Sequence, residues 1–168
     1  MDSVGRLRRI RFWLAVFIVG LVLSGVTAFP LTWELGLLVR WFGSGDGALA
    51  QWLRTVHTGL VETDKHYPFL AYGTDWLAFA HLVIAVAFIG PWRDPVKNIW
   101  VIEFGLIACA MVLPLALVAG PVRGIPFGWR LIDCAFGVFG AIPLWLIRRE
   151  IQQFEQAAIN QVSPENKE

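Results

Sequence analysis

Cysteine is scarce in this sequence. The 168 residues include two cysteines, Cys109 and Cys134, and both lie inside apolar runs. Disulfide-rich domains carry more cysteines in loop-rich surroundings, and zinc sites place their ligands in closely spaced pairs. Neither pattern occurs here, so we interpret both cysteines as small hydrophobic residues within apolar segments.

Charged residues are also scarce, at 16 % of the chain, whereas a soluble globular domain has about 25 %. The net charge of +1 gives no strong positive field, so the sequence argues against nucleic acid as a partner. Apolar residues reach 57 %, and the mean hydropathy is +0.59. Lipid-facing side chains produce such an excess, so we expect a small multi-pass membrane protein whose main partner is the lipid bilayer.

Sequence motifs for catalysis are missing as well. The chain has no nucleophile elbow, no phosphate-binding glycine loop, no cysteine pair with redox spacing and no cluster of metal ligands. Hydrolase, nucleotidase and oxidoreductase activities therefore have no positive support, and whether the protein is an enzyme stays open. The motifs point to no particular family.

The chain contains apolar runs at residues 12–29, 75–90, 99–119 and 129–147. A helix needs about 20 residues to cross the hydrocarbon layer, so each run predicts a membrane-spanning helix. The predicted fold class is all-α, a four-transmembrane-helix bundle. The first run has an alternative, because its basic start and the small residues Val26-Thr27-Ala28 also suit a cleaved signal peptide. Its apolar stretch exceeds the roughly 7–15 residues of a signal, which favours a span.

Between the first and second spans we expect one or two short interfacial amphipathic helices. Residues 31–42 set two tryptophans against Glu34 and Arg40, and residues 49–62 repeat apolar side chains at helical spacing. Both segments are too short or too polar to span, so they should lie along the membrane interface. Residues 43–47 are rich in glycine and predict a loop between them.

Two prolines set the boundaries of this region. Pro30 ends the first span, and Pro68 prevents a continuous helix because it lacks an N–H group and clashes with the preceding turn. Gly73 then allows a sharp bend. We expect Asp75, or Thr74 just before it, to cap the second span by accepting hydrogen bonds from free N–H groups.

Orientation follows from lysine and arginine near the ends of the spans, because these residues concentrate on the cytoplasmic side. One side would carry Arg6, Arg8, Arg9, Arg11, Arg93, Lys97, Arg148 and Arg149. The other would carry Arg40, Arg54, Lys65, Arg123 and Arg130, spread over longer loops. We therefore expect cytoplasmic N- and C-termini in a bacterial inner (plasma) membrane, with residues 30–74 outside. Residues 150–168 would form a polar cytoplasmic tail, helical at first and disordered past Pro164.

Charged residues at membrane depth are costly, by about 2.5–3.5 kcal/mol each on insertion scales, so each needs a partner or a use. The second and fourth spans both begin at the outer face, which should bring their polar residues to one level. The predicted cluster comprises Tyr72, Asp75, His81, Arg123, Arg130 and Asp133. It has two interpretations: a structural ion-pair network that fixes helix register, or a site for an anionic or quinone-like head group or for proton entry.

His81 lies in wholly apolar surroundings and has three interpretations. It could hydrogen-bond a hydroxyl, a carboxylate or a backbone carbonyl of a neighbour. It could ligate a haem b together with His57 or His66. It could also relay protons with Asp75 or Glu103, because histidine changes charge near neutral pH.

Glu103 lies about five residues into the third span, which again leaves two alternatives. It could extend to the cytoplasmic surface and pair there with the basic residues of the 91–98 turn. It could instead face the bundle and form part of an internal relay with His81.

Our leading hypothesis from the sequence is a non-enzymatic accessory or ligand-binding subunit with a polar pocket near the outer membrane face. The alternative is a membrane redox or proton-transfer component that uses His81. A transporter or channel would require an oligomer of this four-span chain. Other membrane subunits are candidate partners in each case.

Overall fold

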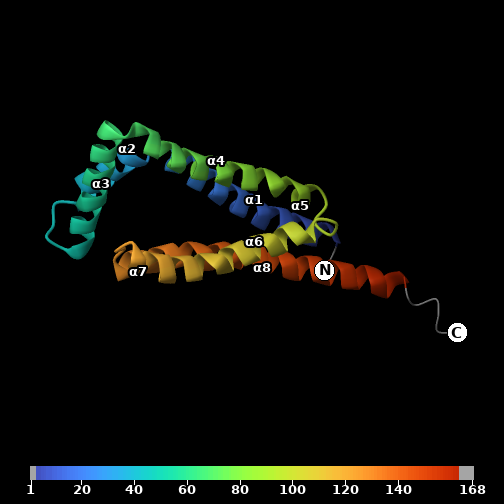
Figure 1. Cartoon of the computed structure of the whole chain (residues 1–168). Helices are drawn as coiled ribbons and strands as arrows, with labels where there is room; N and C mark the ends of the chain where they lie inside the picture. Colours follow the sequence, from blue (N-terminus) through green and yellow to red (C-terminus); the bar gives the residue numbers. More distant parts are fainter. Residues whose placement is uncertain (1–2, 163–168) are drawn as a thin grey trace. The chain divides into compact units, whose positions relative to one another are not determined.

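The structure is a computed structural model that describes residues 3–162, with side chains described from residue 4 to residue 156. Every regular element within this range is helical (Figure 1), as the sequence predicted. In chain order the elements are α1 (Ser3–Ala28), α2 (Leu31–Phe42), α3 (Ala48–His66), the 3-10 helix η1 (Pro68–Leu70), α4 (Ala71–Ala87), α5 (Ile89–Arg93), α6 (Ile99–Pro114), the π-helical turn η2 (Leu115–Ala119), α7 (Gly120–Val122) and α8 (Phe127–Val162).

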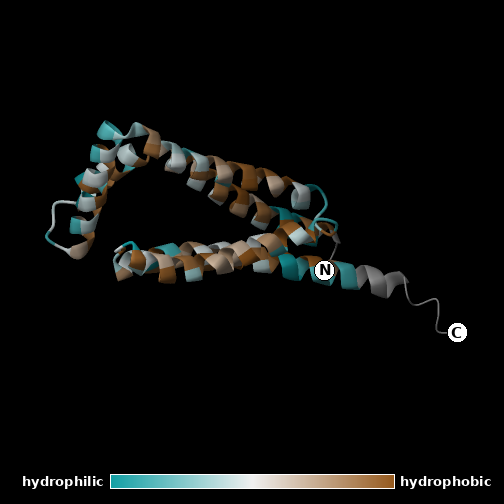
Figure 2. Ribbon diagram, in the orientation of Figure 1, coloured by the Kyte–Doolittle hydropathy of each residue, from teal (hydrophilic) through white to brown (hydrophobic). Residues whose placement is uncertain are grey.

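Four helical segments of the described chain are long and apolar enough to cross a membrane: Val4–Ala28, Pro68–Arg93, Ile99–Val122 and Phe127–Gln156. The shortest of them has 24 residues, which exceeds the roughly 20 that a span requires. Figure 2 shows that hydrophobic residues run along these helices and that α8 becomes hydrophilic toward its end. The membrane-protein class predicted from composition is therefore supported by the length of the helices that form.

The chain divides into two compact units. Within the described residues, the α6–α8 unit comprises residues 3–19 and 86–162, and the α2–α3 unit comprises residues 20–85.

Small residues bring α6 and α8 together in the α6–α8 unit (Figure 1). A methyl group at Gly137 would lie 2.6 Å from the carbonyl oxygen of Cys109, and one at Gly140 would lie 3.1 Å from Sγ of the same residue. Gly105 on α6 faces Leu144 of α8 in the same way, at 2.8 Å. Gly137 and Gly140 thus form a close-packing face of α8 against α6.

The start of α1 belongs to the same unit. Ile10 and Leu14 are fully buried there, and Arg9 donates to Glu150 of α8 across 2.9 Å. The rings of Phe17 and Phe88 pack with their centroids 4.7 Å apart. The unit therefore combines an apolar seam with an ion pair beyond it.

Helices α2 and α3 form a hairpin in the α2–α3 unit, and the glycine-rich loop predicted at residues 43–47 joins them (Figure 1). Arg54 of α3 donates to the carbonyl oxygens of Gly43 and Gly45. The ring of His57 packs against Gly36 of α2, where a methyl group would lie 3.3 Å from its Nε2. The loop is thus held from α3 by a side chain that bonds to its backbone.

The last part of α1 packs against α4 in the α2–α3 unit. A methyl group at Gly25 would lie 2.9 Å from the carbonyl oxygen of Ala78 and 3.1 Å from Cβ of His81. His81 therefore stands on the face of α4 that meets α1.

One sequence prediction about α4 is wrong. Pro68 does interrupt the helix, since α3 ends at His66 and a 3-10 turn follows. However, α4 begins at Ala71, so Thr74 and Asp75 lie inside the helix and do not cap it. Gly73 is helical and makes no bend. The 3-10 turn satisfies the start of α4 by continuing directly into it, which leaves no end for Asp75 to cap.

Helix α8 runs without a break from Phe127 to Val162 and so extends beyond the fourth predicted span into the tail. The expected helical start of the tail is therefore observed as part of α8. The disorder predicted past Pro164 concerns residues outside the described range.

Candidate functional site

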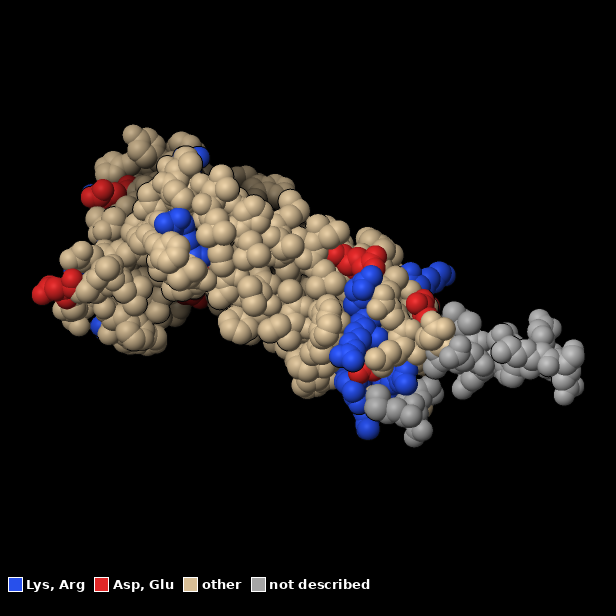
Figure 3. Space-filling model, turned by 90° about the horizontal axis from the view of Figure 1, so that it is seen from below, with Lys and Arg blue, Asp and Glu red and all other residues tan. Residues whose placement is uncertain are grey.

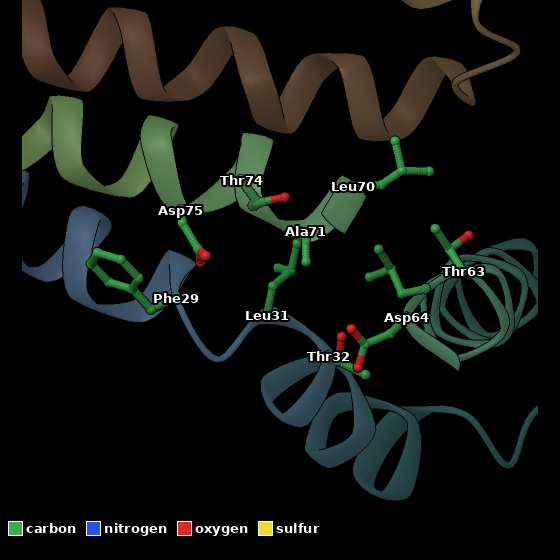
Figure 4. Close-up of a pocket in the computed structure, with 10 residues that line it drawn as sticks. Phe29, Leu31, Thr32, Thr63, Asp64, Leu70, Ala71, Thr74 and Asp75 are labelled. Atoms are coloured by element: carbon green, nitrogen blue, oxygen red, sulfur yellow. The ribbon is translucent and has the colours of Figure 1, made fainter. Parts of the chain in front are cut away.

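A hollow of about 180 Å³ opens in the α2–α3 unit where the end of α1, the start of α2, the end of α3 and the start of α4 meet (Figure 4). We call it the acidic hollow. Its lining residues are Phe29, Leu31, Thr32, Leu60, Thr63, Asp64, Leu70, Ala71, Thr74 and Asp75.

The two proline breaks create this hollow. Pro30 separates α1 from α2, and the non-helical Tyr67, which is followed by Pro68, separates α3 from η1. At each break the chain changes direction, so four helix ends meet without filling the space between them. Helix ends present polar side chains more readily than helix centres at membrane depth, because charges there are costly.

Half of the lining residues are polar, and the charged residues among them are all acidic. Two carboxylates, of Asp64 and Asp75, and the hydroxyls of Thr32, Thr63 and Thr74 line the hollow, with no lysine or arginine among the described lining residues. Figure 4 shows Asp75 reaching from α4 and Asp64 lying beside Thr32. Within the described side chains, neither carboxylate takes part in an ion pair. The site can therefore accept several hydrogen bonds from one cationic group.

The other half of the lining is apolar. Phe29, Leu31, Leu60 and Leu70 supply side-chain surface on the walls around the polar groups. A ligand that fits both halves needs a positively charged end and an apolar body. The volume is close to the roughly 150 Å³ of a cavity that holds one benzene molecule, so the ligand must be small.

A second hollow, of about 230 Å³, lies in the α6–α8 unit beside the π-helical turn, and we call it the α7–α8 hollow. Its lining residues are Val112, Leu115, Ala116, Ala119, Gly120, Arg123, Ile125 and Asp133. It differs from the acidic hollow in presenting one charge of each sign.

Arg130 lies beside the α7–α8 hollow but points elsewhere. The stem of its side chain packs on Gly120, which lines the hollow, and its guanidinium carbon lies 5.2 Å from the centre of the Phe127 ring. No ion pair joins Asp133 to Arg123 or Arg130 in the described structure. The direct Arg–carboxylate clamp predicted from the sequence is therefore not formed among these three residues.

The six residues of the predicted cluster fall into both units. Tyr72, Asp75 and His81 belong to the α2–α3 unit, and Arg123, Arg130 and Asp133 belong to the α6–α8 unit. The convergence of all six remains a prediction. Within the units, the structure brings Asp75 together with Asp64, and Arg123 together with Asp133, each pair on one hollow.

Tyr72 does not line the acidic hollow. Its ring is exposed and meets Trp76 edge-on at 6.0 Å, and Trp76 meets Phe79 in the same way at 5.8 Å. These rings follow one face of α4, an arrangement typical of aromatic residues at a membrane boundary.

Sequence reasoning missed Asp64 and the threonines Thr32 and Thr63. A signal was present, because Thr32 lies two residues after Pro30, and Asp64 and Thr63 lie four and five residues before Pro68. Polar side chains that flank two breaks should have been expected to meet where the broken ends meet.

The histidines form backbone hydrogen bonds or local packing contacts. Nδ1 of His81 donates to the carbonyl oxygen of Leu77 across 2.7 Å, and Nδ1 of His66 donates to that of Glu62 across 2.9 Å. His81 thus bonds to a carbonyl of its own helix, whereas one of its three interpretations was a bond to a neighbour. No group of three or more metal-ligating side chains occurs among the described residues.

Glu103 forms an ion pair, but with a partner that we did not predict. Its Oε1 accepts from Nε of Arg148 on α8 across 3.1 Å. Both side chains are more than a third exposed, at 45 % and 38 %. Its role as an internal relay with His81 remains a prediction, because the two residues belong to different units.

Comparisons of this chain with protein-family models, with curated proteins and with solved structures found no match.

Proposed function

We propose that this integral membrane protein binds a small organic cation in the acidic hollow. One observation carries the proposal: two carboxylates and three threonine hydroxyls line one small hollow, and its described lining offers no positive charge to neutralise them. Asp75 is half-buried and Asp64 is exposed. An unpartnered half-buried carboxylate is costly, so a cationic ligand would gain a charge-assisted hydrogen bond and would relieve that cost at Asp75.

The mixed lining favours an organic cation over a metal ion. Ca²⁺ and Mg²⁺ take six or more ligands, chiefly oxygen atoms of protein and water, whereas much of this wall is leucine and phenylalanine. A protonated amine on a short apolar body would place its N–H groups on Asp64 and Asp75 and its carbon atoms against Leu31 and Leu60. The role is that of a ligand-binding or accessory subunit, as the sequence suggested.

The four apolar helices support a membrane location. We further propose that both termini are cytoplasmic, in a bacterial inner membrane, and that α2 and α3 lie at the outer interface. The band of lysine and arginine visible in Figure 3 supports this orientation, because such residues concentrate on the cytoplasmic side. A cysteine introduced at Ser44, in a variant that lacks Cys109 and Cys134, should react with a membrane-impermeant maleimide in intact cells; reaction only after lysis would reverse the orientation.

The binding test uses benzylamine as the cationic probe and benzyl alcohol as its neutral counterpart. Equilibrium dialysis of the purified full chain in detergent should show benzylamine bound and benzyl alcohol not. Asp75→Asn and Asp64→Asn should each weaken benzylamine binding about tenfold, the effect expected for losing one hydrogen bond to a charged group.

The matched control is Asp46→Asn, because Asp46 is an exposed acid of the same unit in the 43–47 loop. It should leave binding unchanged. Equal binding of the amine and the alcohol would contradict the proposal, as would equal loss in all three variants. A metal site would be identified if millimolar Ca²⁺ displaced the amine and if Leu60→Ala left the affinity for the amine unchanged.

A second candidate function, redox or proton transfer, rests on His81. Its Nδ1 donates to the Leu77 carbonyl, and this hydrogen bond would fix the tautomer that leaves Nε2 free to bind iron or accept a proton. An absorption spectrum of protein expressed with added haem separates the haem version, since the absence of a Soret band would remove it.

A further inference from the structure

The α7–α8 hollow presents two opposite charges that do not neutralise each other. Arg123 and Asp133 both line it, yet neither forms an ion pair within the described structure. Arg123 directly follows the candidate span Ile99–Val122, and Asp133 lies inside the candidate span Phe127–Gln156. Unpaired charges are costly there, so the arrangement calls for a partner that can satisfy both.

The hollow owes its shape to the π-helical turn. Pro114 lacks the N–H that would continue the α-helical pattern, and residues Leu115–Ala119 follow it as a π-helix. Three residues of this turn, Leu115, Ala116 and Ala119, line the hollow. Isolated π-helical turns are rare and occur frequently at functional sites, so the widened turn is a second and independent indication of a site.

The rest of the lining is aliphatic and small. Val112, Leu115 and Ile125 supply apolar walls, while Gly120 is buried beneath the stem of Arg130. The buried Nε of Arg130 has no hydrogen-bond partner in the described structure. A ligand that enters here would therefore meet Arg123, the carboxylate of Asp133 and an apolar wall.

We propose that the α7–α8 hollow binds a phosphate–ammonium zwitterion, the head-group chemistry of ethanolamine phospholipids. The phosphate would pair with Arg123, which can engage two phosphate oxygens through its planar guanidinium. The primary ammonium would donate to Asp133. The glycerol carbons would rest on Leu115 and Val112. This proposal does not depend on a ligand in the acidic hollow.

Each charge of the site makes a separate demand on the ligand. A choline head group carries the same two charges but has no N–H to donate to Asp133, so it should bind more weakly. A glycerol head group keeps the phosphate but lacks the cation. Selectivity for the primary ammonium is therefore the property that distinguishes this site from general binding of lipid phosphate.

The first test uses the wild-type full chain and varies only the lipid. Purified protein is exchanged into nanodiscs that contain equal amounts of phosphatidylethanolamine, its mono- and dimethyl derivatives, and phosphatidylcholine. The lipid that remains bound after detergent extraction is then quantified by mass spectrometry. Retention should fall with each added methyl group, to roughly a tenth for phosphatidylcholine, because each methyl removes an N–H donor. Equal retention of all four lipids would overturn the proposal.

The second test assigns the two ends of the head group. Asp133→Asn should remove the preference for the primary ammonium and leave total phospholipid retention largely intact. Arg123→Gln should lower retention of all four lipids together. The controls Asp46→Asn and Arg40→Gln change exposed residues of the same types and should alter neither property. Loss of lipid selectivity in the controls, or its survival in Asp133→Asn, would contradict the assignment.

A soluble zwitterion is the other source of the same chemistry. Free phosphoethanolamine added at millimolar concentration should not displace the retained lipid, because it lacks the apolar part that Leu115 would contact. Full displacement would show that the site takes the soluble molecule and would overturn the lipid assignment.

Discussion

The α6–α8 unit and the α2–α3 unit both bring helices together through glycine, but they treat charge differently. The α6–α8 unit carries the Arg9–Glu150 and Arg148–Glu103 ion pairs. Within residues 20–85, by contrast, ion pairs are absent, and Asp64 and Asp75 face a hollow unpaired. In the described structure the α6–α8 unit therefore has ion pairs that join its helices and also the unpaired Arg123 and Asp133 on its hollow, whereas the α2–α3 unit has no ion pair.

The glycines show the common part of the two designs. In both units a small residue lets a neighbouring backbone approach to within a distance that no other side chain allows. Close approach of backbones is how helices associate in lipid, where the hydrophobic effect does not drive them together. The comparison therefore predicts that glycine contacts govern the stability of both units and that ion pairs matter less.

The largest effect is expected at Gly137. Gly137→Ala would place a methyl group 2.6 Å from the Cys109 carbonyl oxygen and 3.2 Å from Cβ of Val112. Because the backbone of α6 cannot yield without separating from α8, we expect destabilisation of about 1–3 kcal/mol. Denaturant titration followed by circular dichroism in detergent measures it. Gly128→Ala on the same helix meets nothing within 4 Å and is the control; equal stability of the two variants would contradict this packing.

A smaller effect of the same kind is expected at Gly25. A methyl group there would lie 2.9 Å from the Ala78 carbonyl oxygen, so Gly25→Ala should cost about 1 kcal/mol. It should also shift the ring resonances of His81, whose Cβ lies on the same contact. Gly20→Ala, in the same helix with open space around it, should do neither. If Gly20→Ala proved as damaging as Gly25→Ala, the contact of α1 with α4 would be refuted.

The smallest effects are expected at the ion pairs, and they should differ between the two. Glu150 is 14 % exposed but its partner Arg9 is 49 % exposed, so Glu150→Gln should cost about 0.8 kcal/mol. Glu103 and Arg148 are both more than a third exposed, so Glu103→Gln should cost less than about 0.5 kcal/mol. Melting at low and high salt provides the check, because screening should weaken the exposed pair more. A larger loss of stability in Glu103→Gln than in Glu150→Gln would contradict this ranking of the two ion pairs.

Periodicity and composition were sufficient for the helices and their approximate limits. The apolar runs, the loop at 43–47 and the break at Pro68 were all predicted and observed. These features depend on the backbone conformations that proline and glycine allow and on the length of each apolar run. Both are local properties of the sequence. The prediction that Asp75 caps α4 was wrong because α4 begins earlier, at Ala71, directly after a 3-10 turn. That turn depends on how α3 ends.

The candidate site was only partly predictable. Asp75, Arg123 and Asp133 were chosen because charges in apolar segments are rare, and each of them lines a hollow. Two neighbours were not predicted. Asp64, which shares a hollow with Asp75, was overlooked, and Glu103 pairs with Arg148 and not with the basic 91–98 turn. The rotation of each helix about its own axis decides which residues share a hollow. A helix that is apolar on all of its faces does not specify that rotation.

The amino-acid sequence by itself determined that this chain is helical and suited to a membrane, because the energy of apolar residues in lipid and the backbone limits of proline act locally. Only the tertiary structure decided which carboxylates are paired and which face open space. That outcome depends on where helices end relative to one another within each unit, and glycine contacts between segments distant in sequence set those positions.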